Sequence, residues 1–341
     1  MNTSFKWGIL GASKFALEQM APAIHAAKGN SLVALATKDK EKANKFLALS
    51  DSLKIYDDYI GLLEDPDINA VYIPLPNHIH IEWAMRCLKA GKHVLCEKPI
   101  SMAAGEIDRL IELRDETQLL AAEAYMVVHH PQWQLVKDFV DTGKIGQLVQ
   151  IDGVFSYNNA DDPMNIRNQA NYGGGGIPDI GVYPYGVSRF VTGCEPTKIL
   201  FADIVFENGV DTWASISAQF PGFKMQAVTS MRAAPRQEMT IHGSEGFLKL
   251  SAPFNPNVFD IAQVVFRKGN EQEEIFKFPS ENQYINQVEA FSLSATTAQA
   301  YKCSLEFSKG TQTMIDMVYA RNKELLLSLI HISEPTRRRG I

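Results

Sequence analysis

About the first 125 residues alternate short apolar runs with longer stretches of helical periodicity, and this alternation constrains the fold more than any other feature. Such an order produces parallel strands joined by crossover helices. We therefore expect an α/β half with a doubly wound parallel sheet of the Rossmann type. The predicted strands cover residues 5–10, 32–36, 70–75, 93–96 and 119–124, and the predicted helices cover 14–27, 40–48, 79–90 and 103–116.

The pattern changes after about residue 146, where strand-like segments follow one another with turn signals between them. Consecutive strands indicate an antiparallel sheet, so we expect an α+β domain with a large open, mainly antiparallel sheet. The predicted strands are 147–157, 197–206, 211–219, 223–232 and 237–250, and the predicted helices are 179–191, 283–293 and 306–325.

These patterns predict a dinucleotide-binding domain over residues 1–124 and a substrate-binding and oligomerisation domain over 125–326. An open sheet seldom leaves a broad apolar face in water, so a homodimer or homotetramer is expected. Residues 327–341 resemble the translation of a sequencing adapter and are predicted to be a non-native tail.

Composition excludes several classes of function. A formal net charge of -6 gives no general attraction to nucleic acid or to an anionic membrane. The N-terminus lacks a secretory signal, and four widely spaced cysteines fit a reducing cytoplasm. The scattered histidines predict no metal site; the pair His129 and His130, beside Pro131, is typical of a helix start as well as of a cleft.

Residues 8–16, GILGASKFA, form a modified dinucleotide fingerprint between the first predicted strand and helix. Gly11 takes the turn position, whereas Ser13 replaces the glycine that allows the closest backbone approach. Exposed amides at such a helix start can hold a pyrophosphate, although the segment could also be an ordinary turn. The candidate cofactor residues here are Gly11, Ala12, Ser13, Lys14 and Phe15.

The end of the second predicted strand carries Thr37 and Lys38, followed by Asp39. A carboxylate at this place would bind the adenosine ribose and select NAD. A hydroxyl and an ammonium suit a 2′-phosphate, so NADP is favoured, with NAD as the alternative.

Glu97, Lys98 and Pro99 end a buried strand at the edge where parallel sheets bind ligands. A partly buried lysine can polarise a substrate oxygen or assist proton transfer. The alternative is a structural pair between Glu97 and Lys98.

A glycine run at 173–176 leads into a predicted helix that carries Asp179 and Tyr183. Their spacing of four residues places both side chains on one helix face. Tyr183 could exchange a substrate proton while Lys98 lowers its pKa, and Asp179 could orient a substrate hydroxyl. The same pair is also typical of a helix cap and a packed ring.

Taken in order, these motifs resemble the Gfo/Idh/MocA family of oxidoreductases over nearly all of residues 5–325. The resemblance favours catalytic roles for Lys98, Tyr183 and Asp179. A tyrosine at the last position, and Arg167 in the segment Asn165–Asn168, resemble the branch containing glucose-fructose oxidoreductase, dihydrodiol dehydrogenase and xylose dehydrogenase. It further implies that the nicotinamide is bordered by Leu75, Pro76, Asn77, His80 and Tyr125, and that Arg167, Tyr125 and Asp179 contact substrate.

The implied function is hydride transfer between NADP and a CHOH or C=O carbon of a sugar-like substrate. Two alternatives are a trans-dihydrodiol dehydrogenase with an apolar pocket, and a non-catalytic NAD(P)-binding regulator. Retention of Lys98, Asp179 and Tyr183 argues against the regulator.

Overall fold

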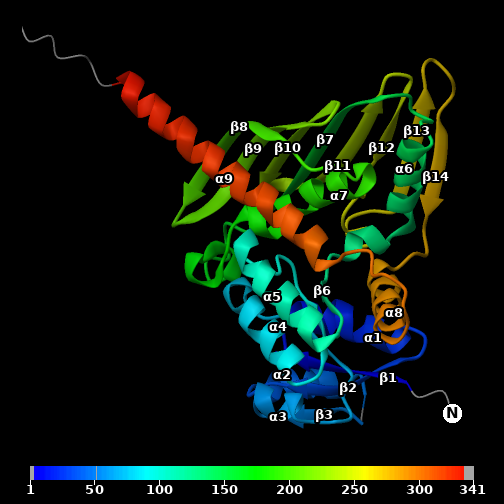
Figure 1. Ribbon diagram of the computed structural model, residues 1–341, viewed down its shortest axis with the longest axis vertical. Helices are drawn as coiled ribbons and strands as arrows, with labels where there is room; N and C mark the ends of the chain where they lie inside the picture. Colours follow the sequence, from blue (N-terminus) through cyan, green and yellow to red (C-terminus); the bar gives the residue numbers. More distant parts are fainter. Residues whose placement is uncertain (1–3, 51, 334–341) are drawn as a thin grey trace, which may run out of the picture.

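The computed structural model describes residues 4–50 and 52–333 of the chain (Figure 1). Its first half is a parallel sheet in the order β3-β2-β1-β4-β5-β6, which confirms the expected doubly wound α/β fold. The strands are β1 (Phe5–Leu10), β2 (Asn30–Ala36), β3 (Lys54–Tyr56), β4 (Ala70–Ile73), β5 (His93–Cys96) and β6 (Ala121–Glu123).

Helices connect these strands close to the predicted positions. The first is a π-helical turn, η1 (Ala16–Met20), that continues into α1 (Ala21–Ala26); the others are α2 (Lys40–Leu47), α3 (Tyr59–Leu63), α4 (His80–Lys89) and α5 (Ala104–Thr117). Strand β3 and helix α3 were not predicted, because elements of three and five residues are too short to show a period.

The second half is built on an eight-stranded sheet in the order β14-β13-β12-β11-β7-β10-β9-β8. Only the β7–β10 pair is parallel among the described pairs, so the mainly antiparallel sheet is confirmed. The strands are β7 (Leu148–Asn158), β8 (Lys198–Glu207), β9 (Val210–Phe220), β10 (Phe223–Ser230), β11 (Arg232–Gly243), β12 (Gly246–Leu250), β13 (Ala262–Lys268) and β14 (Glu274–Phe278).

One predicted strand of this sheet was wrong. The segment 237–250 is a hairpin, because the chain turns at Ser244 and Glu245 and Met239 pairs with Leu250. The hairpin of β13 and β14 was not predicted.

Helices α6 (Pro131–Asp141), α7 (Val182–Thr192) and α9 (Leu305–Ser333) lie on one face of the large sheet (Figure 1). Helix α8 (Gln283–Thr296) returns to the first half and packs on α1, and its Phe291 packs against the fully buried Trp7 of β1 with ring centroids 5.0 Å apart. Helix α9 packs on α5, and Asp316 accepts a hydrogen bond from the backbone N–H of Ala104 at 2.9 Å. The predicted non-native tail begins inside α9, and residues 334–341 lie outside the described part of the chain.

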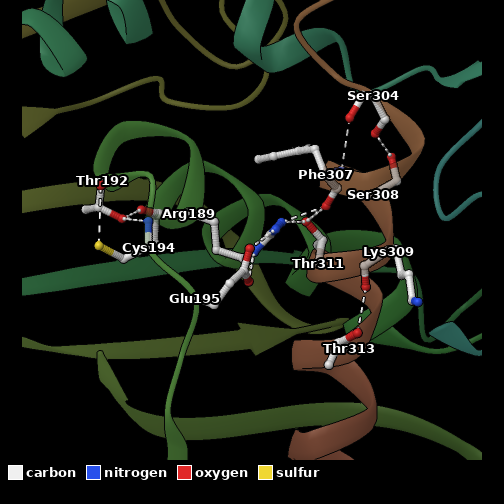
Figure 2. A network of polar contacts seen from close by, with 11 residues as sticks. Arg189, Thr192, Cys194, Glu195, Ser304, Phe307, Ser308, Lys309, Thr311 and Thr313 are labelled. Atoms are coloured by element: carbon white, nitrogen blue, oxygen red, sulfur yellow. Dashed lines mark hydrogen bonds and ion pairs between the residues drawn. The ribbon is translucent and has the colours of Figure 1, made fainter. Parts of the chain in front are cut away.

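A buried arginine ties α7 to α9 (Figure 2). The Arg189 side chain is 3% exposed; its guanidinium pairs with Glu195 and donates to the Phe307 carbonyl at 2.8 Å and to Thr311 Oγ1 at 2.6 Å. Gly310 leaves room for this side chain, because a Cβ there would overlap Nη2 of Arg189. Helix α7 is therefore fixed to the helix that joins the two halves.

None of the helices in the described part of the chain combines the length and the apolar character needed to span a membrane.

Candidate active site

A cleft of about 880 Å³ lies between the carboxyl edge of the parallel sheet and the helix-covered face of the large sheet. The first half contributes the loop after β1 and the segments after β4 and β5, and the second half contributes β7, the loop before α7, and α7 itself. The predicted site residues found in its wall are Ser13, Lys14, Phe15, Leu75, Asn77, Glu97, Lys98, Arg167, Asp179 and Tyr183.

The loop after β1 has the geometry of a phosphate cradle. Gly11 adopts φ +93°, a conformation that favours glycine, and donates its N–H to the carbonyl of Ala36 at 2.9 Å. Ser13 Oγ accepts a hydrogen bond from the backbone N–H of Ala16 at 3.0 Å, so the serine that departs from the fingerprint caps the helix start. Ala12 packs on the core beside the fully buried Ala16. The first-turn amides meet the cleft at Ser13, Lys14 and Phe15, where they fit a pyrophosphate.

The segment after β2 lies outside the cleft wall. Thr37 is half-buried and Lys38 is exposed, and Thr37 Oγ1 accepts the backbone N–H of Asp39 at 3.2 Å. Asp39 caps α2 by accepting the backbone N–H of Lys42 at 3.0 Å, a bond that lowers the pKa of its carboxyl group. The Asp39 carboxylate, which could favour NAD by binding the ribose, is therefore already hydrogen-bonded to the start of α2.

The segment after β4 joins the two halves of the site. Asn77 Nδ2 donates to the carbonyl of Gly173 at 2.8 Å, and Pro76 begins the turn that leads into α4. His80 is fully buried and does not line the cleft; its ring nitrogens bond the carbonyls of Leu75 at 2.6 Å and Pro99 at 2.8 Å. The structure therefore gives His80 the role of a brace between two loops, in place of the predicted cofactor contact.

Lys98 contacts the second half of the site directly. Its Nζ donates to Asp179 Oδ1 at 2.9 Å and to the backbone carbonyl of Asp179 at 2.6 Å. Glu97, the alternative partner, instead accepts the hydroxyl of Tyr72 at 2.6 Å, and burial raises the pKa of its carboxyl group. Pro99 is buried behind the lysine. The structural pairing of Glu97 with the Lys98 ammonium is thus replaced by a pairing across the cleft.

Asp179 is held by three side chains. Besides Lys98, Arg167 Nε lies 2.8 Å and the Tyr157 hydroxyl 2.7 Å from its Oδ2 atom. Burial alone would raise the pKa of Asp179, but the charges of Arg167 and Lys98 outweigh it and hold that pKa below its ordinary value. Asp179 is therefore an anion shared by two cations.

Tyr183 lines the cleft within a group of aromatic rings, with Phe155 and Phe254 each at a centroid distance of 5.6 Å. Its hydroxyl lies 3.7 Å from Met126 Sδ, and Lys98 Nζ lies 5.1 Å from its ring centroid. Burial raises the pKa of Tyr183 well above its ordinary value, and neighbouring acidic groups add to the shift. Burial therefore outweighs the lowering of this pKa that was expected from Lys98, whose ammonium contacts Asp179.

Tyr125 does not contact the cleft. It is 1% exposed and donates its hydroxyl to the carbonyl of Tyr183 at 2.6 Å. The structure thus places this predicted substrate contact behind the α7 start, where its O–H is used by the backbone.

Tyr157, which lies two residues after Phe155 on β7, was not predicted as a site residue. The alternation of inward-facing residues along that strand, with Ile151 and Phe155 buried, is the signal that could have found it. Asp211 on β9, a buried carboxylate with no local sequence signal, was not predicted either.

Asp211 holds the glycine run that begins the Asp179 helix. Its Oδ2 accepts the backbone N–H of Ile177 at 2.6 Å and its Oδ1 accepts the hydroxyl of Tyr319 at 2.7 Å. Gly175, at φ +133°, lies so close that a Cβ would overlap Oδ1. The glycines are therefore needed for a carboxylate to approach the start of the turn η6 (Ile177–Gly181).

Within residues 4–50 and 52–333, no group of three acidic, histidine or cysteine side chains could hold a metal ion.

Comparisons with known proteins agree with this architecture. Residues 5–125 match the family model described as "Oxidoreductase family, NAD-binding Rossmann fold", and residues 133–249 match the "GFO/IDH/MocA C-terminal domain". An uncharacterized oxidoreductase, ORF334 of Rhizobium meliloti, is 37% identical over 92% of this chain and 95% of its own length. A dTDP-3,4-didehydro-2,6-dideoxy-alpha-D-glucose 3-reductase of Saccharopolyspora spinosa is 34% identical over 86% of this chain and 88% of its own.

Among solved structures, the fold is similar to KijD10, a 3-ketoreductase from Actinomadura kijaniata crystallised with NADP and TDP-benzene. The TM-score is 0.86 with 28% identity, over 93% of this chain and 98% of that one. Both family models match adjoining parts of the chain, and the phosphate loop and the Lys98–Asp179 pair face one cleft. This chain therefore belongs to the GFO/IDH/MocA family of oxidoreductases.

Proposed function

We propose that this protein is an NADP-dependent oxidoreductase that interconverts a C=O and a CHOH carbon of a sugar-like substrate. The observation that carries the proposal is the convergence of Lys98, Asp179 and Tyr183 in the cleft that also contains the phosphate loop. When bound, the dinucleotide supplies or accepts the hydride; the chain's own residues bind, orient and exchange the proton.

The dinucleotide would be held by the first-turn amides at Ser13, Lys14 and Phe15, with Leu75 and Asn77 lining the same cleft. NADP is favoured over NAD because the Asp39 carboxylate is occupied by the start of α2. The exposed Lys38 beside it can then meet a 2′-phosphate.

Tyr183 would act as the proton donor in the direction of reduction. Its raised pKa keeps the phenol protonated at neutral pH, which is the form that can give a proton to a developing alkoxide. Lys98 would place a positive charge beside that oxygen. Asp179, ionised between Lys98 and Arg167, would accept a hydrogen bond from a neighbouring substrate hydroxyl.

The polar centre of the cleft also separates the alternatives. Lys98, Arg167, Tyr157 and Asp179 offer several hydrogen-bonding groups around one point, which suits a polyhydroxylated ring better than an aromatic dihydrodiol. A regulator without catalysis would not need a charged cluster buried beside the cofactor loop. We further propose that the protein acts as a homo-oligomer in the cytoplasm.

The test is reduction of keto sugars followed at the nicotinamide absorbance, with NADPH and NADH compared. Lys98→Ala and Tyr183→Phe are expected to bind NADPH within about three-fold of the unmodified protein and to lose about 10²–10⁴-fold in turnover. Tyr301→Phe, which changes a buried tyrosine outside the cleft wall, is the matched control. Unchanged turnover in both site variants would refute the assignment.

A further inference from the structure

Four large apolar side chains stand exposed in the wall of the cleft that Asp179 and Tyr183 also line, and we call this group the mouth of the cleft. Met164 is 79% and Ile166 43% exposed on the loop before the glycine run, and Val258 is 68% and Phe259 37% exposed on the loop after β12. All four belong to the wall of the same cleft. Single exposed apolar residues are ordinary, whereas four around one opening mark a binding surface.

The first of these loops is held by side chains. Arg232 donates to Asn159 Oδ1 at 2.8 Å and to Asn168 Oδ1 at 3.1 Å, and Asn168 Nδ2 donates to the carbonyl of Asp162 at 2.8 Å. The loop carrying Met164 is therefore fixed at both sides.

The second loop is anchored on the reacting centre. In this loop, the backbone carbonyl of Asn255 accepts the backbone N–H of Phe259 at 2.9 Å, and the N–H of Asn255 donates to Gln237 Oε1 at 3.0 Å. The preceding Phe254 packs directly on the ring of Tyr183. A group bound by Phe259 would thus be at a fixed place relative to the proton donor.

The charges at the cleft determine what this opening can accept. Its cations among the described residues are Lys14, Lys98 and Arg167. Lys98 and Arg167 both bind Asp179, and Lys14 lies on the phosphate loop. Within the described chain, the part of the cleft around Asp179 therefore has no cation that is free of an acidic partner. A diphosphate needs several charge-assisted hydrogen bonds for its recognition, so this part of the cleft does not suit one.

Neighbouring cations do not change this. Arg232 and Arg236 pair with Glu207 and Glu238 and are absent from the described cleft wall. Arg86, Lys89 and Arg109 line a second groove instead.

We propose that the mouth of the cleft is an aglycone subsite, and that the substrate is an uncharged glycoside whose sugar ring carries an aryl or alkyl group, as opposed to a sugar nucleotide. The inference rests on the proposed function and names its substrate class. The ring hydroxyls would lie at Asp179, Arg167 and Tyr157, and the apolar group would cover Phe259 and Met164.

The test compares three substrates with the same reacting carbon: a free keto sugar, its phenyl glycoside and its thymidine-diphosphate ester. With NADPH, kcat/KM is expected to be at least ten-fold higher for the phenyl glycoside than for the free sugar, mainly through KM, and no higher for the nucleotide ester. Phe259→Ala and Met164→Ala should each lower that preference at least three-fold. Val205→Ala, an exposed apolar side chain on β8 outside the cleft wall, should leave it unchanged.

Equal rates for the free sugar and the phenyl glycoside, or a preference for the nucleotide ester, would overturn the aglycone subsite and leave the proposed function standing. Absence of turnover with all three substrates would overturn both. Oligomeric state is measured in parallel by light scattering. If Phe259→Ala changes the oligomeric state and leaves the substrate preference intact, a second copy of the chain covers these side chains and the subsite is refuted.

Discussion

Gly310→Ala gives a sharp test of how the site is held in place. Alanine is a better helix former than glycine by about 1 kcal/mol, so this change inside a helix would ordinarily stabilise the protein. At this position, however, the added Cβ overlaps Nη2 of the buried Arg189. The guanidinium must then move from its hydrogen bonds to Phe307 and Thr311.

The expected magnitude follows from the bonds at risk. Hydrogen bonds to charged groups contribute about 1.5–3 kcal/mol each. Glu195 is 63% exposed and can follow the arginine, so we count only the two bonds to α9 and expect one of them to be lost outright. After subtracting the helix-propensity gain, Gly310→Ala should lower the free energy of unfolding by about 0.5–2 kcal/mol.

The assay is urea denaturation followed by circular dichroism, with Gly105→Ala as the matched control. Gly105 lies in the first turn of α5, and a Cβ there meets nothing within 4 Å. That variant should be neutral or stabilised by up to about 1 kcal/mol. The reasoning is refuted if Gly310→Ala is as stable as Gly105→Ala, or if it destabilises Arg189→Met as much as it destabilises the unmodified protein.

Two further outcomes are expected. Asp211→Asn removes a carboxylate that accepts hydrogen bonds from the N–H of Ile177 and the hydroxyl of Tyr319. Turnover should therefore fall at least ten-fold, whereas NADPH affinity, measured by fluorescence, should stay within three-fold. An equal loss of turnover and of affinity would contradict a role confined to the α7 start. Burial lowers the pKa of His129 to about 3 and of His130 to about 4. Below about pH 6.5, therefore, only the unfolded chain takes up protons at these two histidines. The free energy of unfolding should fall by about 1.4 kcal/mol per histidine per pH unit, down to about pH 4. Burial also lowers the pKa of His80 and of His93, which add to the same loss. His129→Phe should therefore remove only the share of His129, about 2 kcal/mol between pH 7.5 and pH 5 in urea titrations, and an equal loss in the variant would contradict this prediction.

The sequence alone was sufficient for the fold class, and it singled out several residues that line the cleft. Strand and helix periods are local, so the alternation in the first half predicted the parallel sheet and placed Glu97 and Lys98 at its carboxyl edge. The spacing of Asp179 and Tyr183 likewise placed both in one cleft.

Tertiary structure decided what these groups do to one another. The partners of Asp179 come from the segment after β5, from β7 and from the loop before the glycine run, and no local pattern brings Tyr157 beside Arg167. The pKa of Tyr183 depends on burial and on charges distant in sequence, so the direction of its shift could not be predicted from the spacing of Asp179 and Tyr183. Asp211, on β9, reaches the backbone N–H of Ile177 through the space left by the missing side chain of Gly175. Secondary structure follows from neighbours along the chain, whereas protonation and orientation at the site follow from neighbours in space.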